Sequence, residues 1–262
     1  MQPDHWDELF DEIYLHTYAD RFDEEESATE AFAAAKLAGL EPPAELLDAP
    51  AGFGRHSIPL ASAGFHVTAA DRSSVQLDEG RRRAGDAEWP RFIQADFREL
   101  PFEDDAFDGV LNLFSSIGYR GEDGDRKMLG EFLRVLRPNG ALVLETQHRD
   151  RVMAIFQPRT WDPLADDSLV AEARRFDPVA GEIETDHIYV AGGTRRTFTY
   201  TLRVYTATEL VRMVEGVGFG EIECFGDYDR GELTRETRLV LRAQAPASSY
   251  SPGAFGSSSA AI

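Results

Sequence analysis

The chain of 262 residues carries 47 acidic and 27 basic side chains, which gives a formal net charge of −20. A surface this acidic repels nucleic acid and anionic membranes, so no nucleic-acid or membrane partner is expected and a small-molecule partner is favoured. The N-terminal stretch is acidic where a secretory signal is basic and then apolar, and no apolar run is long enough to span a bilayer, so a cytoplasmic protein is expected.

The N-terminal segment, residues 1–43, is expected to be helical. A first helix is predicted because apolar side chains recur at helical spacing opposite an acidic face; this apolar stripe is formed by Trp6, Leu9, Phe10, Ile13 and Thr17. A second helix is predicted over residues 24–37, ended by Gly39 before the Pro42-Pro43 break.

Between residues 44 and 150, short apolar runs alternate with helical stretches. This alternation is typical of a parallel sheet with crossover helices. Strands are predicted at residues 45–48, 66–70, 91–94, 107–113 and 141–146. The intervening helices are predicted at residues 56–63, 75–84 and 124–137.

After residue 150 the pattern changes to alternating polar and apolar side chains. Residues 151–206 predict an antiparallel insertion with strands at 168–176, 182–190 and 197–205. Residues 207–245 predict a helix capped by Thr208 and a reversed strand pair at 220–225 and 238–242, which completes the core. The tail, residues 246–262, is rich in Ser, Gly and Ala and is expected to be disordered.

The segment from residue 45 to 73 has the order strand, glycine-rich turn, helix, strand, acid. Gly52 and Gly54 allow the backbone to approach a ligand where a Cβ would collide, and Asp71 closes the second strand, where it can bind ribose hydroxyls. Two other interpretations remain: a tight turn with Asp71 capping the next helix, or an NAD site. Against NAD, Ser57 stands where the third fingerprint glycine is needed.

These motifs, followed by the sequences FIQADFRELPF, FDGVLNLF and RVLRPNGALVLE, resemble the class I S-adenosylmethionine-dependent methyltransferase family over residues 44–146. The resemblance implies an α/β fold: a seven-stranded, mostly parallel, doubly wound sheet with a reversed C-terminal strand. It also implies an N-terminal helical lid and an antiparallel β insertion. The implied cofactor is S-adenosylmethionine, with S-adenosylhomocysteine as the product.

The family's cofactor contacts are carried over at matching positions. The turn motif of the family usually begins with glycine, whereas this chain has Pro50 there. The resemblance places an acid on the ribose, an Asp-Phe pair on the adenine and the end of the fourth strand on the methionine. The residues expected to contact the cofactor are Asp48, Ala49, Gly52, Gly54, Arg55, His56, Asp71, Arg72, Asp96, Phe97, Asn112, Leu113 and Tyr18.

His148 is the candidate general base, because it follows a strand end above the carboxyl edge of the sheet and histidine titrates near neutrality. A surface or substrate-orienting histidine is the equal alternative. The six histidines show no ligand spacing, and methyl transfer from a sulfonium needs no metal, so no metal is expected.

The insertion is expected to form a wall over the pocket or the contact of a homodimer. For Arg149 and Arg203, pairing with the abundant carboxylates is the alternative to binding an anionic substrate. The residues expected to meet the substrate are Tyr14, His16, Ser115, Tyr119, Arg149, Tyr200 and Arg203.

The leading hypothesis is methyl transfer to a nitrogen or oxygen nucleophile of a small molecule. An RNA or protein methyltransferase is an alternative, but the acidic charge and the Asn-Leu-Phe-Ser sequence after the fourth strand, which lacks an amide-recognition motif, weigh against it. An NAD-dependent oxidoreductase and a noncatalytic cofactor-binding module also remain.

Overall fold

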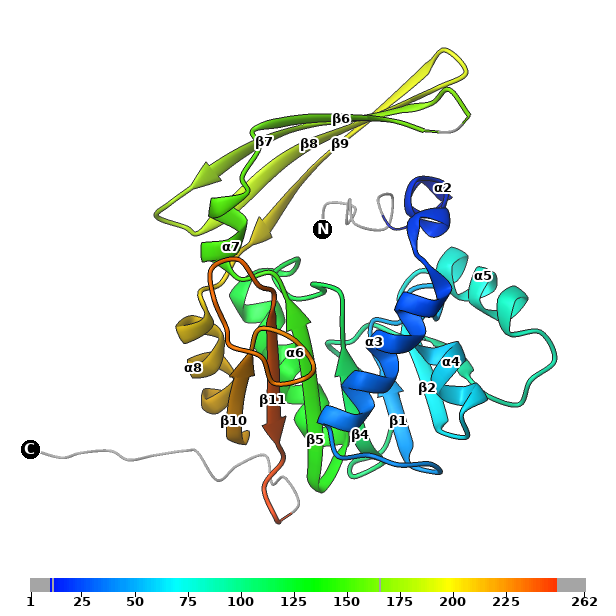
Figure 1. Cartoon of the computed structure of the whole chain (residues 1–262), viewed down its shortest axis with the longest axis vertical. Coiled ribbons are helices and arrows are strands. Elements are labelled where there is room, and N and C mark those ends of the chain that lie inside the picture. Colours follow the sequence, from blue (N-terminus) through cyan, green and yellow to red (C-terminus); the bar gives the residue numbers. More distant parts are fainter. Residues whose placement is uncertain (1–9, 11, 165, 249–262) are drawn as a thin grey trace, which may run out of the picture.

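The computed structural model describes residues 10, 12–164 and 166–248. Within these residues, seven strands form one sheet in the order β10-β11-β5-β4-β1-β2-β3 (Figure 1). Strands β1 to β5 and β10 run parallel, and the C-terminal strand β11 is reversed, as predicted. The bounds are β1 Glu45–Asp48, β2 His66–Asp71, β3 Arg91–Gln94, β4 Phe107–Asn112, β5 Leu136–Thr146, β10 Gly220–Phe225 and β11 Leu239–Gln244.

Helices cover both faces of this sheet, so it is doubly wound. Helices α6 (Gly121–Val135) and α8 (Ala207–Val217) pack on one face, where Phe132 is fully buried. Helices α3 (Glu24–Leu37) and α4 (Ser57–Ser62) pack on the other face. The central strands β1, β4, β5 and β11 bury apolar side chains on both sides, which is the pattern of a sheet between two helical layers.

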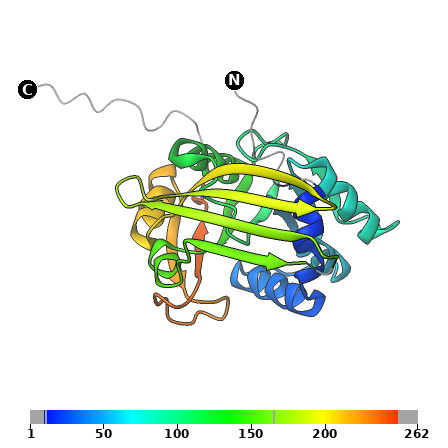
Figure 2. The ribbon, with the colours of Figure 1, turned by 90° about the horizontal axis from the view of Figure 1, so that it is seen from above.

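A second sheet lies across the carboxyl ends of the parallel strands and is called the roof sheet here (Figures 1 and 2). Within the described residues it has four antiparallel strands in the order β6-β7-β8-β9. Helix α7 (Arg149–Ala154) leads into it from β5. The strands are β6 Arg159–Pro163, β7 Leu169–Asp177, β8 Glu182–Ala191 and β9 Thr194–Arg203.

The sequence pattern predicted β7, β8 and β9 but neither α7 nor β6. Strand β6 is a mostly exposed edge strand that ends in Pro163, so it lacks the alternation that reveals a half-buried strand. Helix α7 buries none of its residues, so it carries no apolar stripe.

The N-terminal segment runs from the roof sheet down to the core. Helix α2 (Glu12–Tyr18) is followed by the short helix η1 (Ala19–Arg21) and by α3, where the Asp23 side chain accepts a hydrogen bond of 2.8 Å from the Glu26 amide. Trp6 and Leu9, predicted for the first helix, lie outside the described residues, as does most of the tail predicted to be disordered. In the described part of the chain, no helix is long and apolar enough to cross a membrane.

The remaining crossover helix, α5 (Ser74–Ala84), packs its Leu77 near the β2–β3 edge of the sheet. Helix α8 begins one residue earlier than predicted, and its cap is Thr206 rather than Thr208. Thr206 and Glu209 form a capping box, in which the hydroxyl accepts from the Glu209 amide and the carboxylate accepts from the Thr206 amide.

Replacing Thr206 by alanine is expected to lower the free energy of unfolding by about 1 kcal/mol, because an amide at the helix start loses its acceptor. Thr208→Ala is the matched control: Thr208 is exposed within the helix, where alanine is the better helix former. Urea denaturation of both variants measures the difference. Equal losses would contradict the assignment of the cap.

Candidate functional site

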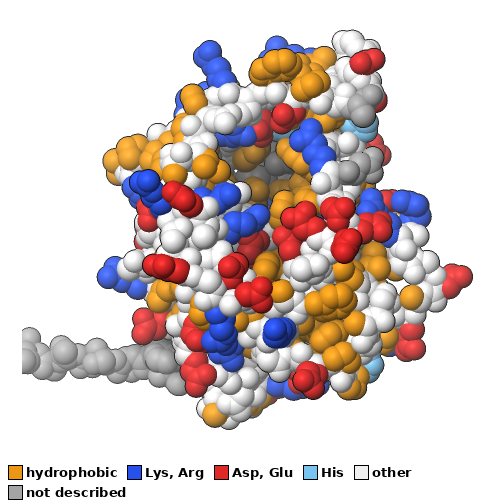
Figure 3. All heavy atoms as spheres, viewed as in Figure 1, with side chains coloured by type: hydrophobic (Ala, Val, Ile, Leu, Met, Phe, Trp, Pro, Cys, Tyr) orange, Lys and Arg blue, Asp and Glu red, His pale blue; other side chains and the backbone are white. Residues whose placement is uncertain are grey.

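A cavity of about 520 Å³ lies between the carboxyl ends of the parallel strands and the roof sheet. Figure 3 shows this face of the molecule hollowed beneath the roof sheet. Turns that follow β1 to β5 supply its floor, and the N-terminal segment and the roof sheet supply its upper wall. Aromatic and arginine side chains dominate the lining, among them Phe10, Tyr14, Tyr18, Arg21, Phe22, Phe53, Arg55, Arg72, Phe97, Phe114, Tyr119, Arg120, Tyr200 and Arg238.

The glycine-rich turn after β1 forms one side of the floor. Gly52 lines the cavity with φ +57°, in the left-handed region that favours glycine. Gly54, with φ +78°, does not line the cavity, and a Cβ there would approach the Phe92 ring to 2.9 Å. Both glycines are therefore required by the backbone, but only Gly52 is placed to touch a ligand.

Asp48, at the end of β1, supports the turn from below and lies outside the cavity lining. Its buried carboxylate accepts a 2.5 Å hydrogen bond from the Ser57 hydroxyl at the start of α4, and burial raises its pKa to about 7. The Ala49 carbonyl accepts a 2.7 Å hydrogen bond from the Asn112 amide, which ties the end of β1 to the end of β4. Asp48, Ala49 and Asn112 were predicted to contact the cofactor, and in the structure they hold the turn in place.

Asp71 lies on the cavity wall at the end of β2, as its sequence position predicted. Its Oδ2 accepts from the Gly52 amide and its Oδ1 from the Ser73 amide, each at 2.8 Å. A carboxylate offers about four lone-pair positions, so both oxygens retain capacity for hydroxyl donors. Burial raises the pKa of Asp71. Arg72 lines the cavity beside it.

The predicted adenine pair, Asp96 and Phe97, is split by the structure. Phe97 lines the cavity. The Asp96 carboxylate lies outside the lining, and Arg98 binds both of its oxygens at 2.9 and 2.5 Å. Its pKa falls to about 2, chiefly through these hydrogen bonds. The structure thus shows this carboxylate in an ion pair, and its contact with the adenine amine stays a prediction.

The loop after β4 forms the opposite side of the floor, with Leu113 and Ser115 on the cavity wall. Phe114 adopts φ +62° and Ser115 φ +58°, an uncommon conformation for residues with side chains. The buried Glu145 carboxylate stabilises the loop by accepting a 2.7 Å hydrogen bond from the Phe114 amide. Arg238 pairs with Glu145 and donates to the Ser115 hydroxyl oxygen at 3.0 Å.

Arg55 and His56, at the start of α4, line the cavity and share one carboxylate on α3. Glu30 Oε2 lies 2.8 Å from Arg55 Nη1 and 3.1 Å from His56 Nε2. Burial lowers the pKa of His56 to about 4, although its hydrogen bond to Glu30 opposes this. Burial acts to raise the pKa of Glu30, but hydrogen bonds from His56 and Arg55 outweigh it and hold the pKa at about 2.

This depressed pKa predicts an acid-dependent loss of stability. The contribution of Glu30 to the free energy of unfolding is present above its ordinary pKa of 4.5 and is lost as the pH falls through about 2. Glu30→Gln is expected to lower the free energy of unfolding by about 1.5–3 kcal/mol at pH 7, the range for hydrogen bonds to charged groups. Near pH 3 the loss should be clearly smaller. Glu25→Gln, at an exposed position of the same helix, is the control. Thermal unfolding at the two pH values tests this, and an equal cost at both would contradict it.

His148 does not reach the cavity, which corrects its expected role as general base. Its side chain is buried, and Nε2 lies 3.1 Å from the Thr234 carbonyl and 3.2 Å from the Thr237 carbonyl. The ring therefore anchors the loop before β11 as a structural side chain. Arg149, next to it, lies over the Phe176 ring at 5.5 Å and outside the cavity lining.

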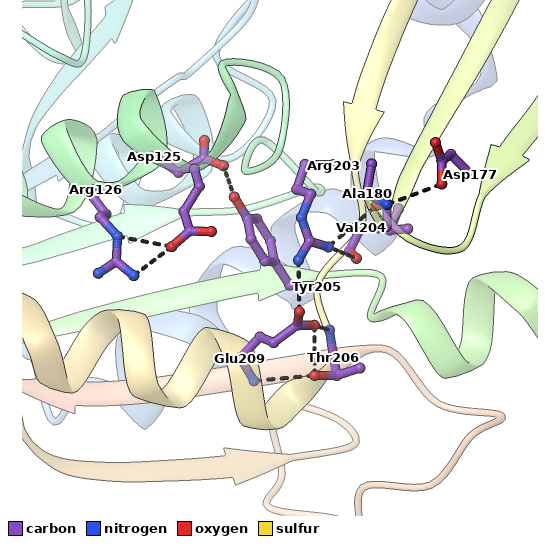
Figure 4. A network of polar contacts seen from close by, with 11 residues as sticks. Asp125, Arg126, Asp177, Ala180, Arg203, Val204, Tyr205, Thr206 and Glu209 are labelled. Carbon is purple, nitrogen blue, oxygen red and sulfur yellow. Dashed lines mark hydrogen bonds and ion pairs between the residues drawn. The ribbon is translucent and has the colours of Figure 1, made fainter.

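Arg203 is also a structural residue rather than a substrate contact. Figure 4 shows its guanidinium between the end of β9 and the start of α8. It donates to the Val204 carbonyl at 2.5 Å and to Glu209 at 2.7 Å, and it lies over the Tyr205 ring. In the same network, Tyr205 donates a 2.6 Å hydrogen bond to the buried Asp125. Pairing with a carboxylate, the alternative drawn from the sequence, is what the structure shows.

Four tyrosines from distant parts of the sequence meet at the cavity. Tyr14, Tyr18, Tyr119 and Tyr200, named from the sequence as cofactor or substrate contacts, all line it. Burial raises the pKa of all four, for Tyr18 to about 12, so their hydroxyls stay protonated at neutral pH. His16 points elsewhere: it lies 3.0 Å from Asp166 and links α2 to the roof sheet.

Several cavity residues were not predicted from the sequence, among them Gln76, Phe114, His187 and Arg238. The alternation of β8 contained a usable signal for His187, which shares its face with the buried Ile183 and Thr185. Among the described residues, no group of three His, Cys, Asp or Glu side chains forms a metal site.

Residues 46–140 match a family model described as a methyltransferase domain. Over 99 residues the chain is 46% identical to a demethylmenaquinone methyltransferase of Clavibacter sepedonicus, covering 38% of this chain and 39% of that protein. It is 31% identical over 198 residues to a glycine/sarcosine N-methyltransferase of Parasynechococcus marenigrum, covering 71% of this chain and 66% of that protein. The match spans about two fifths of the length of the first curated relatives.

Solved structures share the fold over most of the chain. The CcbJ methyltransferase from Streptomyces caelestis superposes with a TM-score of 0.73 at 23% identity, covering 89% of this chain and 96% of that one. The structure of CalS10 with bound S-adenosylmethionine, an amino pentose methyltransferase from Micromonospora echinaspora, gives a TM-score of 0.64 at 22% identity, covering 89% and 97%. The chain thus contains a methyltransferase domain over residues 46–140 and shares the fold of S-adenosylmethionine-dependent methyltransferases of known structure.

Proposed function

We propose that this protein transfers a methyl group from S-adenosylmethionine to a nitrogen or oxygen nucleophile of a small molecule. The observation that carries the proposal is the convergence of Gly52, Asp71 and Phe97 on one cavity beneath the roof sheet. A glycine turn, a ribose-binding acid and an aromatic ring at the carboxyl ends of parallel strands are the elements that hold a nucleoside in open α/β sheets.

The residues on the cavity wall fit this cofactor. Asp71 would accept hydrogen bonds from the ribose hydroxyls, Phe97 would pack on the base, and the turn at Gly52 leaves room beside them. The buried Oε1 of Gln76, also on the wall, has no hydrogen-bond partner among the described residues and offers an acceptor to the ligand. Bound there, the cofactor supplies an activated methyl group on a sulfonium centre.

The protein's own part is to align the acceptor and to exclude water. The roof sheet and the N-terminal segment cover the cavity, so the acceptor has to fit beneath them. A volume of about 520 Å³ is in the range of small-molecule sites. The similar proteins named above are methyltransferases of demethylmenaquinone, of glycine or sarcosine, and of an amino pentose, which supports a small acceptor over a macromolecule.

Calorimetry with S-adenosylhomocysteine and, separately, NAD tests the cofactor. We expect saturable binding of the first, with a Kd of about 1–100 μM, and no heat from the second. A screen of pooled metabolites with isotopically labelled methyl donor then tests transfer. Binding of NAD alone would overturn the proposal in favour of an oxidoreductase. Binding of S-adenosylhomocysteine without any methyl transfer would favour a noncatalytic module.

A further inference from the structure

His187 lies on the face of the roof sheet that is turned toward the cavity. In the register of the sheet it stands opposite Glu172 on β7 and Phe198 on β9, and directly opposed residues share a face. Its side chain is 2% exposed and contributes to the cavity lining.

The two ring nitrogens of His187 have different surroundings. Nδ1 lies 3.3 Å from Oε1 of Glu172. Nε2 is buried and has no hydrogen-bond partner in the described part of the chain. A buried polar atom without a partner destabilises the folded protein by about 1–3 kcal/mol, so such an atom calls for a partner such as a water molecule or a ligand. Because His187 lines the cavity, a bound ligand is the natural partner for Nε2.

Glu172 determines which nitrogen carries the proton. Burial acts to raise the pKa of Glu172, but the hydrogen bond to His187 and the charge of Arg174 outweigh it, and the pKa is lowered. The side chain is therefore a carboxylate at neutral pH, which can only accept a hydrogen bond, so Nδ1 carries the donated proton. This leaves the lone pair on Nε2, the nitrogen without a protein partner.

We propose that His187 Nε2 is the general base for the methyl acceptor, a small molecule whose hydroxyl or amine donates a hydrogen bond to it, and that Glu172 is its positioning residue. This rests on the proposed function. In the step, the proton passes from the acceptor atom to Nε2 as that atom forms a bond to the methyl carbon. The carbon–sulfur bond breaks, its electron pair stays on sulfur, and Glu172 stabilises the imidazolium.

Other titratable groups surround this pair and define the environment for a pH profile. They are Arg174 on β7, Tyr200 on β9, Tyr18 on α2 and Tyr119 in the loop before α6. Burial raises the pKa of each of these tyrosines, so they stay neutral over the range in which a histidine base acts.

The test uses the full chain and a panel of labelled-donor assays with small alcohols, phenols and amines. His187→Gln keeps a hydrogen-bonding group of similar reach but has no basic nitrogen. It should lower kcat by about 10²- to 10⁴-fold, the range for a lost general base, and abolish the rise of kcat with pH. Binding of S-adenosylhomocysteine should be unchanged, because His187 lies outside the proposed nucleoside contacts.

Two further variants keep the result decisive. Glu172→Gln should lower kcat by about tenfold and move the pH profile to lower pH, because the imidazolium loses its carboxylate. His66→Gln removes a histidine that pairs with Glu45 at 2.9 Å outside the cavity lining, and it should change neither kcat nor the profile. If His187→Gln does not fold, the pH profile of kcat for Glu172→Gln decides whether His187 is the base.

Four outcomes would overturn the inference. One is a kcat of His187→Gln within about threefold of wild type, since a lost base costs far more. The others are a pH profile that Glu172→Gln leaves unchanged, a change in acceptor KM alone, and no transfer to any panel member by wild-type protein that binds S-adenosylhomocysteine. Failure of wild-type protein to bind that product would instead refute the proposed function.

Discussion

Replacing Asp71 by asparagine is expected to weaken binding of S-adenosylhomocysteine by about 100-fold. The substitution removes the negative charge and one acceptor oxygen, and hydrogen bonds to charged groups contribute about 1.5–3 kcal/mol each. The new amide group also faces the backbone donors at Gly52 and Ser73, which lie 2.8 Å from the carboxylate oxygens. Calorimetry on wild type and variant measures the ratio.

Asp78→Asn is the matched control for this experiment. Asp78 lies on α5, is 73% exposed and pairs with Arg81 on the surface, so its substitution should leave affinity within about twofold. An Asp71→Asn variant that binds as tightly as this control would contradict the assignment of Asp71 to the ribose.

Replacing Arg238 by methionine is expected to destabilise the protein by about 3–5 kcal/mol, because it leaves a buried charge without its partner. The Glu145 side chain is 5% exposed and pairs with Arg238. The same carboxylate binds the Phe114 amide, so the cavity loop should loosen as well. Urea denaturation measures the free energy of unfolding.

The pair offers an internal check through a double mutant. Glu145→Gln combined with Arg238→Met should lose less stability than the sum of the two single variants, because no unpaired charge remains. Arg230→Met is the control, since Arg230 and its partner Glu223 are 52% and 40% exposed and such pairs contribute about 1 kcal/mol or less. A loss of that size for Arg238→Met, or simple additivity, would contradict this account of the loop.

The core could be predicted from sequence because its signals are local. The helix Glu24–Leu37 and the strands Glu45–Asp48 and Arg91–Gln94 have the predicted bounds, since each is a short apolar or capped segment between turn residues. Strand β5 begins at Leu136 rather than at residue 141, because Leu136 pairs with Phe107 before a register shift. A short stretch of sequence carries no signal for its pairing with a strand that is distant along the chain.

The floor of the site was also predictable in large part, since Gly52 and Asp71 belong to one continuous strand-turn-helix-strand motif and both line the cavity. The upper wall was predicted only in part, since Tyr14, Tyr18 and Tyr200 were named from the sequence whereas His187 was not. His148 has the right position after a strand, but carbonyls 86 and 89 residues away bind its ring. His187 faces the cavity only because β7, β8 and β9 form a sheet above the core. Long-range contacts of this kind determine which of the two histidines faces the cavity.

A crystal structure grown with S-adenosylhomocysteine tests the central claim most directly. The account predicts density for the nucleoside in the cavity beneath the roof sheet, with the ribose hydroxyls on the Asp71 carboxylate and the base against Phe97. An empty cavity at saturating ligand would contradict it. So would a nucleoside bound elsewhere, with the Asp71 carboxylate still accepting only from the Gly52 and Ser73 amides.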